Sequence, residues 1–204
     1  RLKARYAPSS PQATIRYFEQ LSKENPSNEN KYAYLTALQG IGDFKKALIL
    51  VDELLSKYPK NLILNITKSE IYLLAQELDK AKIQIEQVLK ISPGNYPASI
   101  IKSNILSAQN KTIQAEEIVR ELLISKNNDP HLWMLLSEIQ RSGKNILGYH
   151  LSRGEYYLLL GDLENALNQF QFALRLSSNS FQTSETIMTK IKYAQDRLGQ
   201  KRGL

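Results

Sequence analysis

The chain has 204 residues, of which 42% are hydrophobic and 23% charged, a composition typical of a globular protein with one or two domains. It contains no cysteine and only two histidines, His131 and His150, which excludes disulfides, thiolate metal sites, a thiol nucleophile and the zinc-binding H-E-x-x-H motif. No apolar run approaches the roughly 18 to 20 residues that a membrane-spanning helix needs, so we expect no transmembrane segment.

The net charge of +7 lies at the two ends of the chain. Residues 1–16 carry four basic and no acidic side chains, and residues 186–204 carry five basic and one acidic, so each end has a charge of +4. Residues 17–185 hold 18 basic and 19 acidic side chains, a net of −1. Since a nucleic-acid groove needs a continuous positive field, we expect no nucleic-acid partner. We interpret the basic residues as two solvated ends, and the alternative is an anionic surface or an acidic partner that touches both ends.

The chain begins with Arg1 and shows no apolar signal-peptide core, so we expect a processed protein or a piece of a longer one. Its first predicted element is a single helix over residues 9–27. Ala13 in this helix precedes Ala47 by the same interval that separates the alanines of the repeat described next.

Three alanines, Ala47, Ala81 and Ala115, follow one another at one constant interval, within the range of about 20 to 50 residues that indicates a repeat array. Around them, apolar residues recur at i, i+3, i+4 and i+7, which is the pattern of a helix with one buried face. Proline at positions 59 and 93 ends two of these helices because it cannot continue the backbone hydrogen-bond ladder. Each period therefore predicts two helices, in units 28–61, 62–95 and 96–129.

The spacing of the repeats changes after residue 129. A further unit begins at Pro130 and has Trp133 as its fourth residue, but the next alanine in the pattern, Ala166, comes one and a half periods after Ala115. We therefore expect overlapping repeats over 130–178 that share the helix at 145–160. Residues 181–199 then predict a terminal helix with one apolar face and a polar back, as the end of a repeat array requires.

This pattern resembles the tetratricopeptide repeat (TPR), a helix–turn–helix of about 34 residues with small residues at positions 8 and 20. Position 20 falls on the three alanines and on Ala166, and Gly154 then occupies position 8 of the last unit. At position 8 the three regular units depart from the small residue of the family, since this position holds Leu35, Ser69 and Ser103. The resemblance implies an all-α protein of about 11 helices, a right-handed superhelix of antiparallel helix pairs forming a single solenoid over residues 1–204.

In that family the first helices of the repeats line a groove that binds a partner. The corresponding residues are Tyr32, Thr36, Ile63, Ile66, Glu70, Ile100, Ile101, Asn104, His131, Met134, Leu135, Glu138 and Arg141. Because several of them are apolar, the resemblance implies an apolar groove that holds a protein or peptide partner. Two alternatives remain: another domain of the same protein fills the groove, or the register of the repeats is shifted.

Some TPR proteins bind acidic C-terminal tails through a two-carboxylate clamp, which needs Lys, Arg and Asn at positions 5, 6 and 9. These positions here hold Tyr32, Ile66, Ile100 and Met134, and only Asn104 matches, so we expect no such clamp. The adjacent acid pairs Asp52–Glu53 and Glu116–Glu117 are typical of solvated helix faces, and no nucleophile motif is present. We expect no catalytic residue, metal site or cofactor in this chain.

A more specific resemblance rests on residues 149–166 and on the opening segments 5–7 and 13–18. These are similar to the C-terminal TPR domain of BepA-like (YfgC-type) bacterial zinc metalloproteases. The resemblance implies a periplasmic protein whose repeats pack on a protease domain, with its H-E-x-x-H motif before Arg1, and act in outer-membrane protein assembly or quality control. The alternatives are a stand-alone TPR adaptor in a secretion, pilus or lipoprotein assembly complex and, less favoured by the charge, an RNA-binding repeat. The sequence leaves the oligomeric state open.

Overall fold

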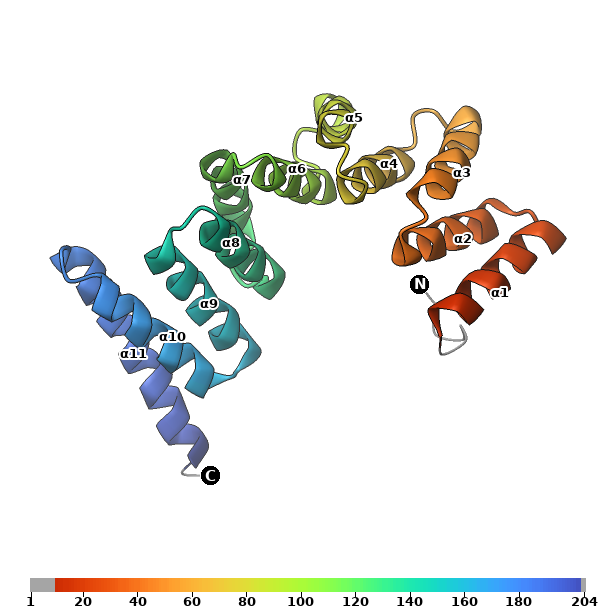
Figure 1. Ribbon diagram of the computed structural model, residues 1–204. Helices are drawn as coiled ribbons and strands as arrows, with labels where there is room; N and C mark the ends of the chain where they lie inside the picture. The colour runs from red at the N-terminus through yellow and green to blue at the C-terminus, as the bar shows by residue number, and fades with distance from the viewer. Residues whose placement is uncertain (1–9, 203–204) are drawn as a thin grey trace. The chain divides into compact units, whose positions relative to one another are not determined.

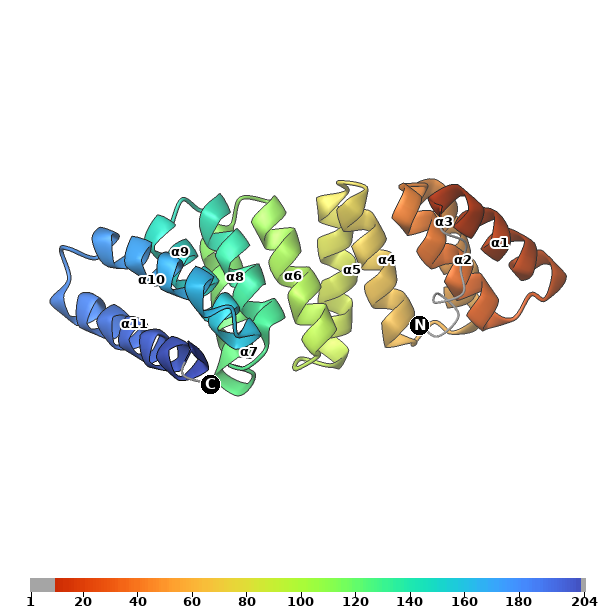
Figure 2. The ribbon, with the colours of Figure 1, turned by 90° about the horizontal axis from the view of Figure 1, so that it is seen from below.

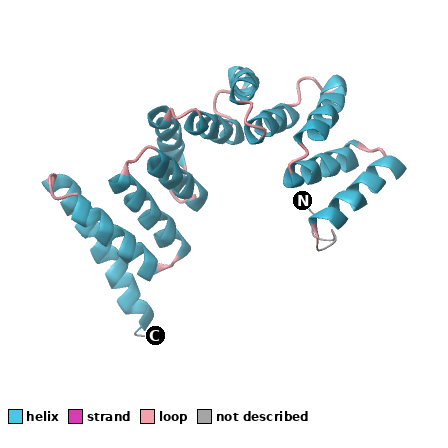
Figure 3. Cartoon of the chain, in the orientation of Figure 1, coloured by secondary structure: helices cyan, strands magenta, loops and turns pink. Residues whose placement is uncertain are grey.

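The computed structural model describes residues 10–202, and within them the chain forms eleven α-helices joined by short loops, with no strand (Figures 1 and 3). It divides into two compact units, residues 1–105 and 106–204. The helices are α1 (Pro11–Glu24), α2 (Asn28–Ile41), α3 (Phe44–Lys57), α4 (Leu62–Leu74), α5 (Leu78–Ile91), α6 (Tyr96–Ala108), α7 (Thr112–Ser125), α8 (Pro130–Ser142), α9 (Ile146–Leu160), α10 (Leu163–Leu176) and α11 (Phe181–Arg202). The predicted all-α helical-repeat class is confirmed. The predicted segments 1–9 and 203–204 lie outside the described residues.

Short polar residues begin many of these helices by accepting hydrogen bonds from otherwise unpaired backbone N–H groups. Asn61 accepts from the N–H of Leu64 at 3.1 Å, and Asn145 accepts from that of Gly148 at 3.0 Å. Ser27 does the same at the start of α2. The helices thus begin where the local sequence supplies a cap. The limits of the individual repeats remain a prediction.

The backbone repeats a left-handed turn with the same period as the buried alanines. Gly42, Gln76, Asn110 and Lys144 all have a φ between 60° and 78°. After each of them the next residue donates its N–H to a carbonyl five positions back, as Glu77 does to Tyr72 at 2.9 Å. This 6→1 bond is the Schellman ending of a helix. Gly161 repeats the turn only half a period after Lys144, at the place where the spacing of the repeats changes.

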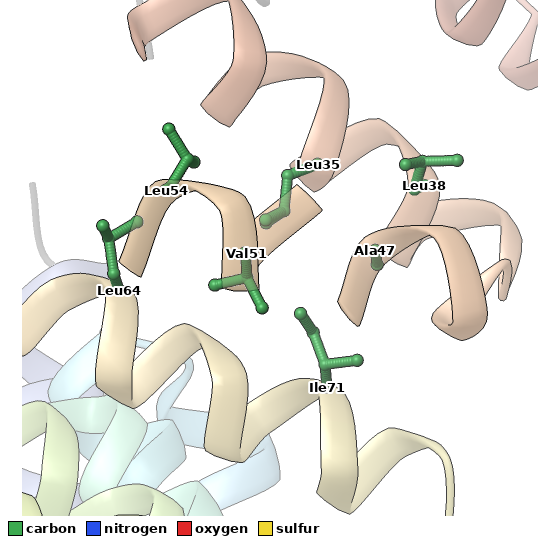
Figure 4. Packing of buried hydrophobic residues seen from close by; sticks show 7 residues of the cluster. All are labelled: Leu35, Leu38, Ala47, Val51, Leu54, Leu64 and Ile71. Carbon is green, nitrogen blue, oxygen red and sulfur yellow. The ribbon is translucent and has the colours of Figure 1, made fainter. Parts of the chain in front are cut away.

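In the first unit the core lies between successive helices. Leu35 and Leu38 of α2 meet Ala47, Val51 and Leu54 of α3, and Leu64 and Ile71 of α4 complete the cluster (Figure 4). Ala47 has no exposed surface, since the neighbouring helices approach too closely for a larger side chain. A second cluster joins α5 and α6 through Ala81, Ile85, Val88, Ala98, Ile101 and Ile105.

Ion pairs cross the same helix contacts. Lys31 of α2 pairs with Glu53 of α3, and Asp52 of α3 pairs with Lys68 of α4 at 2.8 Å. The adjacent acids Asp52 and Glu53 thus each bind a lysine of a different helix, which gives the acid pair of the sequence a structural role.

In the second unit, α9 packs against both α8 and α10, and α11 lies alongside α10 (Figures 1 and 2). Two glycines permit the double contact of α9. A β-carbon on Gly148 would come within 2.7 Å of the amide nitrogen of Gln140 on α8, and one on Gly154 would overlap the ring of Phe170 on α10. On α11, Ile187 and Ala194 are fully buried, in agreement with the apolar face predicted for the terminal helix.

Candidate partner-binding surface

The predicted groove residues of the first unit are only partly accessible. Tyr32 is half-buried against the α2–α4 cluster, and its hydroxyl lies 3.2 Å from that of Thr67. Ile66 packs in the same way against the α5–α6 cluster. Ile63, by contrast, is 64% exposed. Glu70, Ile100 and Asn104 are half-buried.

The groove prediction is wrong for one residue, Ile101. Ile101 is only 9% exposed and belongs to the α5–α6 core cluster, together with Ile85 and Val88. Its neighbour Ile100 is half-buried, because adjacent residues of a helix point about 100° apart. Ile101 is therefore a core residue rather than a wall of an open groove.

The predicted residues of the second unit, Met134, Leu135 and Glu138, lie half-buried on α8. Met134, Glu138 and Arg141 follow one another at i, i+4 and i+7 and so share one stripe of the helix. Glu138 accepts two hydrogen bonds from Arg141, at 3.0 Å from Nε and 2.6 Å from Nη2.

The structure adds Arg153 of α9 to this stripe. Its Nη1 contacts the sulfur of Met134 at 2.9 Å, and its Nη2 donates to the hydroxyl of Tyr157 at 2.6 Å. The guanidinium carbon lies 4.9 Å from the centre of the Tyr157 ring and 5.6 Å from that of Tyr156, both within cation–π range. Arg153 is thus held between a thioether and two aromatic rings.

The surface continues to α10 through His150. Its ring stacks on Phe172 with 5.2 Å between centroids, and its Nδ1 lies 2.9 Å from the amide oxygen of Gln169. Tyr149 meets the same ring edge to face. Phe172 is 47% exposed, so this aromatic pair reaches solvent.

We call these residues the α8–α10 surface: Met134, Glu138 and Arg141 of α8, His150, Arg153 and Tyr157 of α9, and Gln169 and Phe172 of α10. Sequence reasoning missed its α9 and α10 members because it assigned groove positions only to the first helices of the units beginning at residues 28, 62, 96 and 130, and so to no residue of α9 or α10. The signal was present in the shared helix, where three tyrosines, a histidine and an arginine fall between residues 149 and 157.

A hollow of about 400 Å³ lies elsewhere in this unit, between α7, α8, α9 and α11. Its charged side chains are already paired, Arg120 with Glu116 and Lys190 with Glu155. Its buried Gln140 donates to Glu116 at 3.0 Å and accepts from Ser152 at 2.7 Å. With these charged side chains and the buried amide paired within the protein, this hollow offers less for a ligand than the α8–α10 surface.

Over residues 10–200, whose side chains are described, no group of three or more His, Cys, Asp or Glu is placed to hold a metal ion. Within the described part of the chain, no helix combines the length and the apolar character needed to cross a bilayer.

By sequence, the chain matches no family profile and no curated protein. Solved structures do match it. A tetratricopeptide repeat protein from Parabacteroides merdae is 16% identical over 91% of this chain and 78% of its own, with a TM-score of 0.58. A thermophilic TPR protein from Thermus thermophilus is 20% identical over 91% and 93%, with a TM-score of 0.57. YrrB, described as a TPR protein with an unusual peptide-binding site, is 13% identical over 91% and 97%, with a TM-score of 0.53.

The chain has the tetratricopeptide-repeat fold. In the predicted register Gly154 would be the small residue at position 8 and Phe170 the large residue at position 24, and the structure packs Phe170 directly against Gly154. Ala47, Ala81, Ala115 and Ala166, which the same register predicts at position 20, are all fully buried.

Proposed function

We propose that this chain is a non-catalytic protein-interaction domain that binds a peptide segment of a partner along the α8–α10 surface. The observation that carries the proposal is the accessible, aromatic and cationic surface formed by Arg153, His150 and Phe172. The residues that dominate binding energy at protein interfaces are enriched in aromatic side chains and arginine, which combine a large contact area with polar groups.

The TPR fold supports this proposal, and so does the similarity to YrrB, a TPR protein described with a peptide-binding site. The proposed role requires no cofactor, metal or catalytic residue in this chain. Of the predicted residues, Met134 and Glu138 belong to the α8–α10 surface and Leu135 is the neighbour of Met134 on α8. Ile63, Ile66, Glu70, Ile100 and Asn104 belong to the first unit and would form a separate contact.

For the parent protein, we propose the C-terminal part of a BepA-like periplasmic zinc protease, on the resemblance of residues 149–166. The alternative is a stand-alone adaptor in a secretion, pilus or lipoprotein assembly complex. The complete reading frame decides between them: a zinc-binding H-E-x-x-H motif encoded before Arg1 supports the protease parent, and a frame without one contradicts it.

Peptide binding is tested by selecting from a phage-displayed library of random peptides on the immobilised chain. We expect enriched peptides whose affinity falls at least about tenfold in the Phe172→Ser variant, because an exposed aromatic anchor is lost. Phe181→Ser is the matched control, since Phe181 is 80% exposed at the start of α11 and lies outside the surface. No enrichment, or an equal loss in both variants, would contradict the proposal.

A further inference from the structure

Arg153 is an arginine without an acidic partner. Among the described residues, no carboxylate lies within ion-pair distance of its guanidinium. Its Nη1 contacts only a thioether sulfur, which is a weak acceptor, and its Nη2 donates to a neutral hydroxyl. Its Nε has no exposed surface and no hydrogen-bond partner. The cation is therefore partly desolvated and poorly compensated.

The acid on the same helix as Arg153 and the acid one turn from Met134 are both paired with other residues. Glu138, one turn after Met134 on α8, is held by two hydrogen bonds from Arg141. Glu155, two positions after Arg153, pairs with Lys190 of α11. The protein thus leaves the guanidinium without a paired carboxylate and holds it beside the adjacent rings of Tyr156 and Tyr157.

Each terminal nitrogen of Arg153 carries two N–H groups, and the protein uses one of each. One N–H on each terminal nitrogen is therefore left for the oxygens of a carboxylate, which arginine can bind through two parallel hydrogen bonds. A carboxylate arriving from solvent would also supply the charge that the half-buried cation lacks.

We propose that Arg153 receives an aspartate or glutamate side chain of the partner peptide, a step that rests on the proposed binding function. The surroundings favour an acidic side chain within the peptide over a terminal carboxylate. Contact surface continues on both sides of Arg153, to Met134 on α8 and to His150 and Phe172 on α10. A bound chain could therefore extend in both directions and place apolar residues next to the acid. This subsite differs from the two-carboxylate clamp, whose positions hold Tyr32, Ile66, Ile100 and Met134.

The test uses the strongest peptide from the selection, synthesised with an acetylated N-terminus and an amidated C-terminus. Its dissociation constant is measured by fluorescence anisotropy, with each acid replaced in turn by its amide, on the wild-type chain and on Arg153→Gln. We expect one replacement to weaken binding about tenfold on the wild-type chain and to have no effect on Arg153→Gln, because both changes remove the same charge-assisted contact.

Arg120→Gln is the matched control, since Arg120 lines the hollow between α7, α8, α9 and α11, outside the α8–α10 surface, and pairs with Glu116. On this variant the acid should matter as much as on the wild-type chain, and circular dichroism should show all variants equally helical. Selected peptides without an acid, or an acid effect that persists on Arg153→Gln, would overturn this inference while leaving peptide binding intact. A peptide that binds only with a free C-terminal carboxylate would also overturn it. Failure to select any peptide would overturn the proposed function and this inference together.

Discussion

Gly154 of α9 lies directly against the ring of Phe170 of α10, so that a β-carbon on the glycine would come 2.8 Å from Cζ and closer still to Cε1 and Cδ1. Phe170 is fully buried and cannot move aside without disturbing its cluster with Ala173 and Ile187. This contact lets α9 pack against α10 while its other side packs against α8.

We therefore expect Gly154→Ala to destabilise the protein by about 2 kcal/mol, since overpacking a tight core outweighs the better helix propensity of alanine. Gly199→Ala on α11 is the matched control. A β-carbon there would meet nothing within 4 Å, and the substitution should stabilise by roughly 0.5 to 1 kcal/mol. Urea denaturation followed by circular dichroism measures both, and equal shifts of the two variants would refute the close-packing argument.

The left-handed turns give a second prediction. Gln76, Asn110 and Lys144 adopt a φ near 60°, which costs a non-glycine residue about 1 kcal/mol. Replacing Gln76 or Lys144 by glycine should therefore raise the free energy of unfolding by up to about 1 kcal/mol. The reverse change, Gly42→Gln, should lower it by a similar amount, because Gly42 has a φ of 78°. If Gly42→Gln does not change the free energy of unfolding in thermal or urea denaturation, the left-handed backbone at these positions does not carry the expected energetic cost.

Two isoleucines predicted for the same groove should differ in how much stability is lost when each is replaced by alanine. Ile101 is buried in the α5–α6 cluster, so Ile101→Ala should cost about 2 to 4 kcal/mol through lost burial and a cavity. Ile63 is largely exposed, and Ile63→Ala should change stability by less than about 0.5 kcal/mol. Comparable costs in urea denaturation would show that the assignment of one to the core and the other to the surface is wrong.

The ion pair between Lys31 and Glu53 gives a pH dependence. The hydrogen bond from Lys31, together with its positive charge, lowers the pKa of Glu53 below its ordinary value. A lowered pKa in the folded state means that the pair stabilises the protein above the ordinary glutamate pKa of about 4.3 and loses this contribution as the pH falls through the folded value.

Glu53→Gln should accordingly be less stable than the wild-type chain at pH 7, by less than about 1 kcal/mol because the carboxylate is partly exposed, and this difference should shrink as the pH falls below the ordinary glutamate pKa of about 4.3. Urea denaturation at a series of pH values measures the difference. Glu117→Gln is the control, because Glu117 is exposed and forms no ion pair among the described residues. A gap between Glu53→Gln and the wild-type chain that is unchanged from pH 7 to pH 3 would contradict the assignment.

The sequence by itself determined the helical class, the repeat period and the change of rhythm after residue 129. These features depend on local rules: the spacing of apolar residues, the proline stops and the capping residues act within a few positions of the chain. The buried alanines could be recognised for the same reason, since a small residue repeated at one period indicates a repeated close approach of helices.

Only the tertiary structure decided which side chains of each helix are open to a partner. Ile100 and Ile101 are adjacent and chemically alike, but only Ile101 is buried, because only Ile101 packs into the α5–α6 core cluster. The grouping of Arg153 with Met134 and Tyr157 likewise depends on how α8 and α9 pack. That packing is set by contacts between residues far apart in sequence, including the fit of Phe170 onto Gly154, and no local pattern encodes which charge is left without a partner.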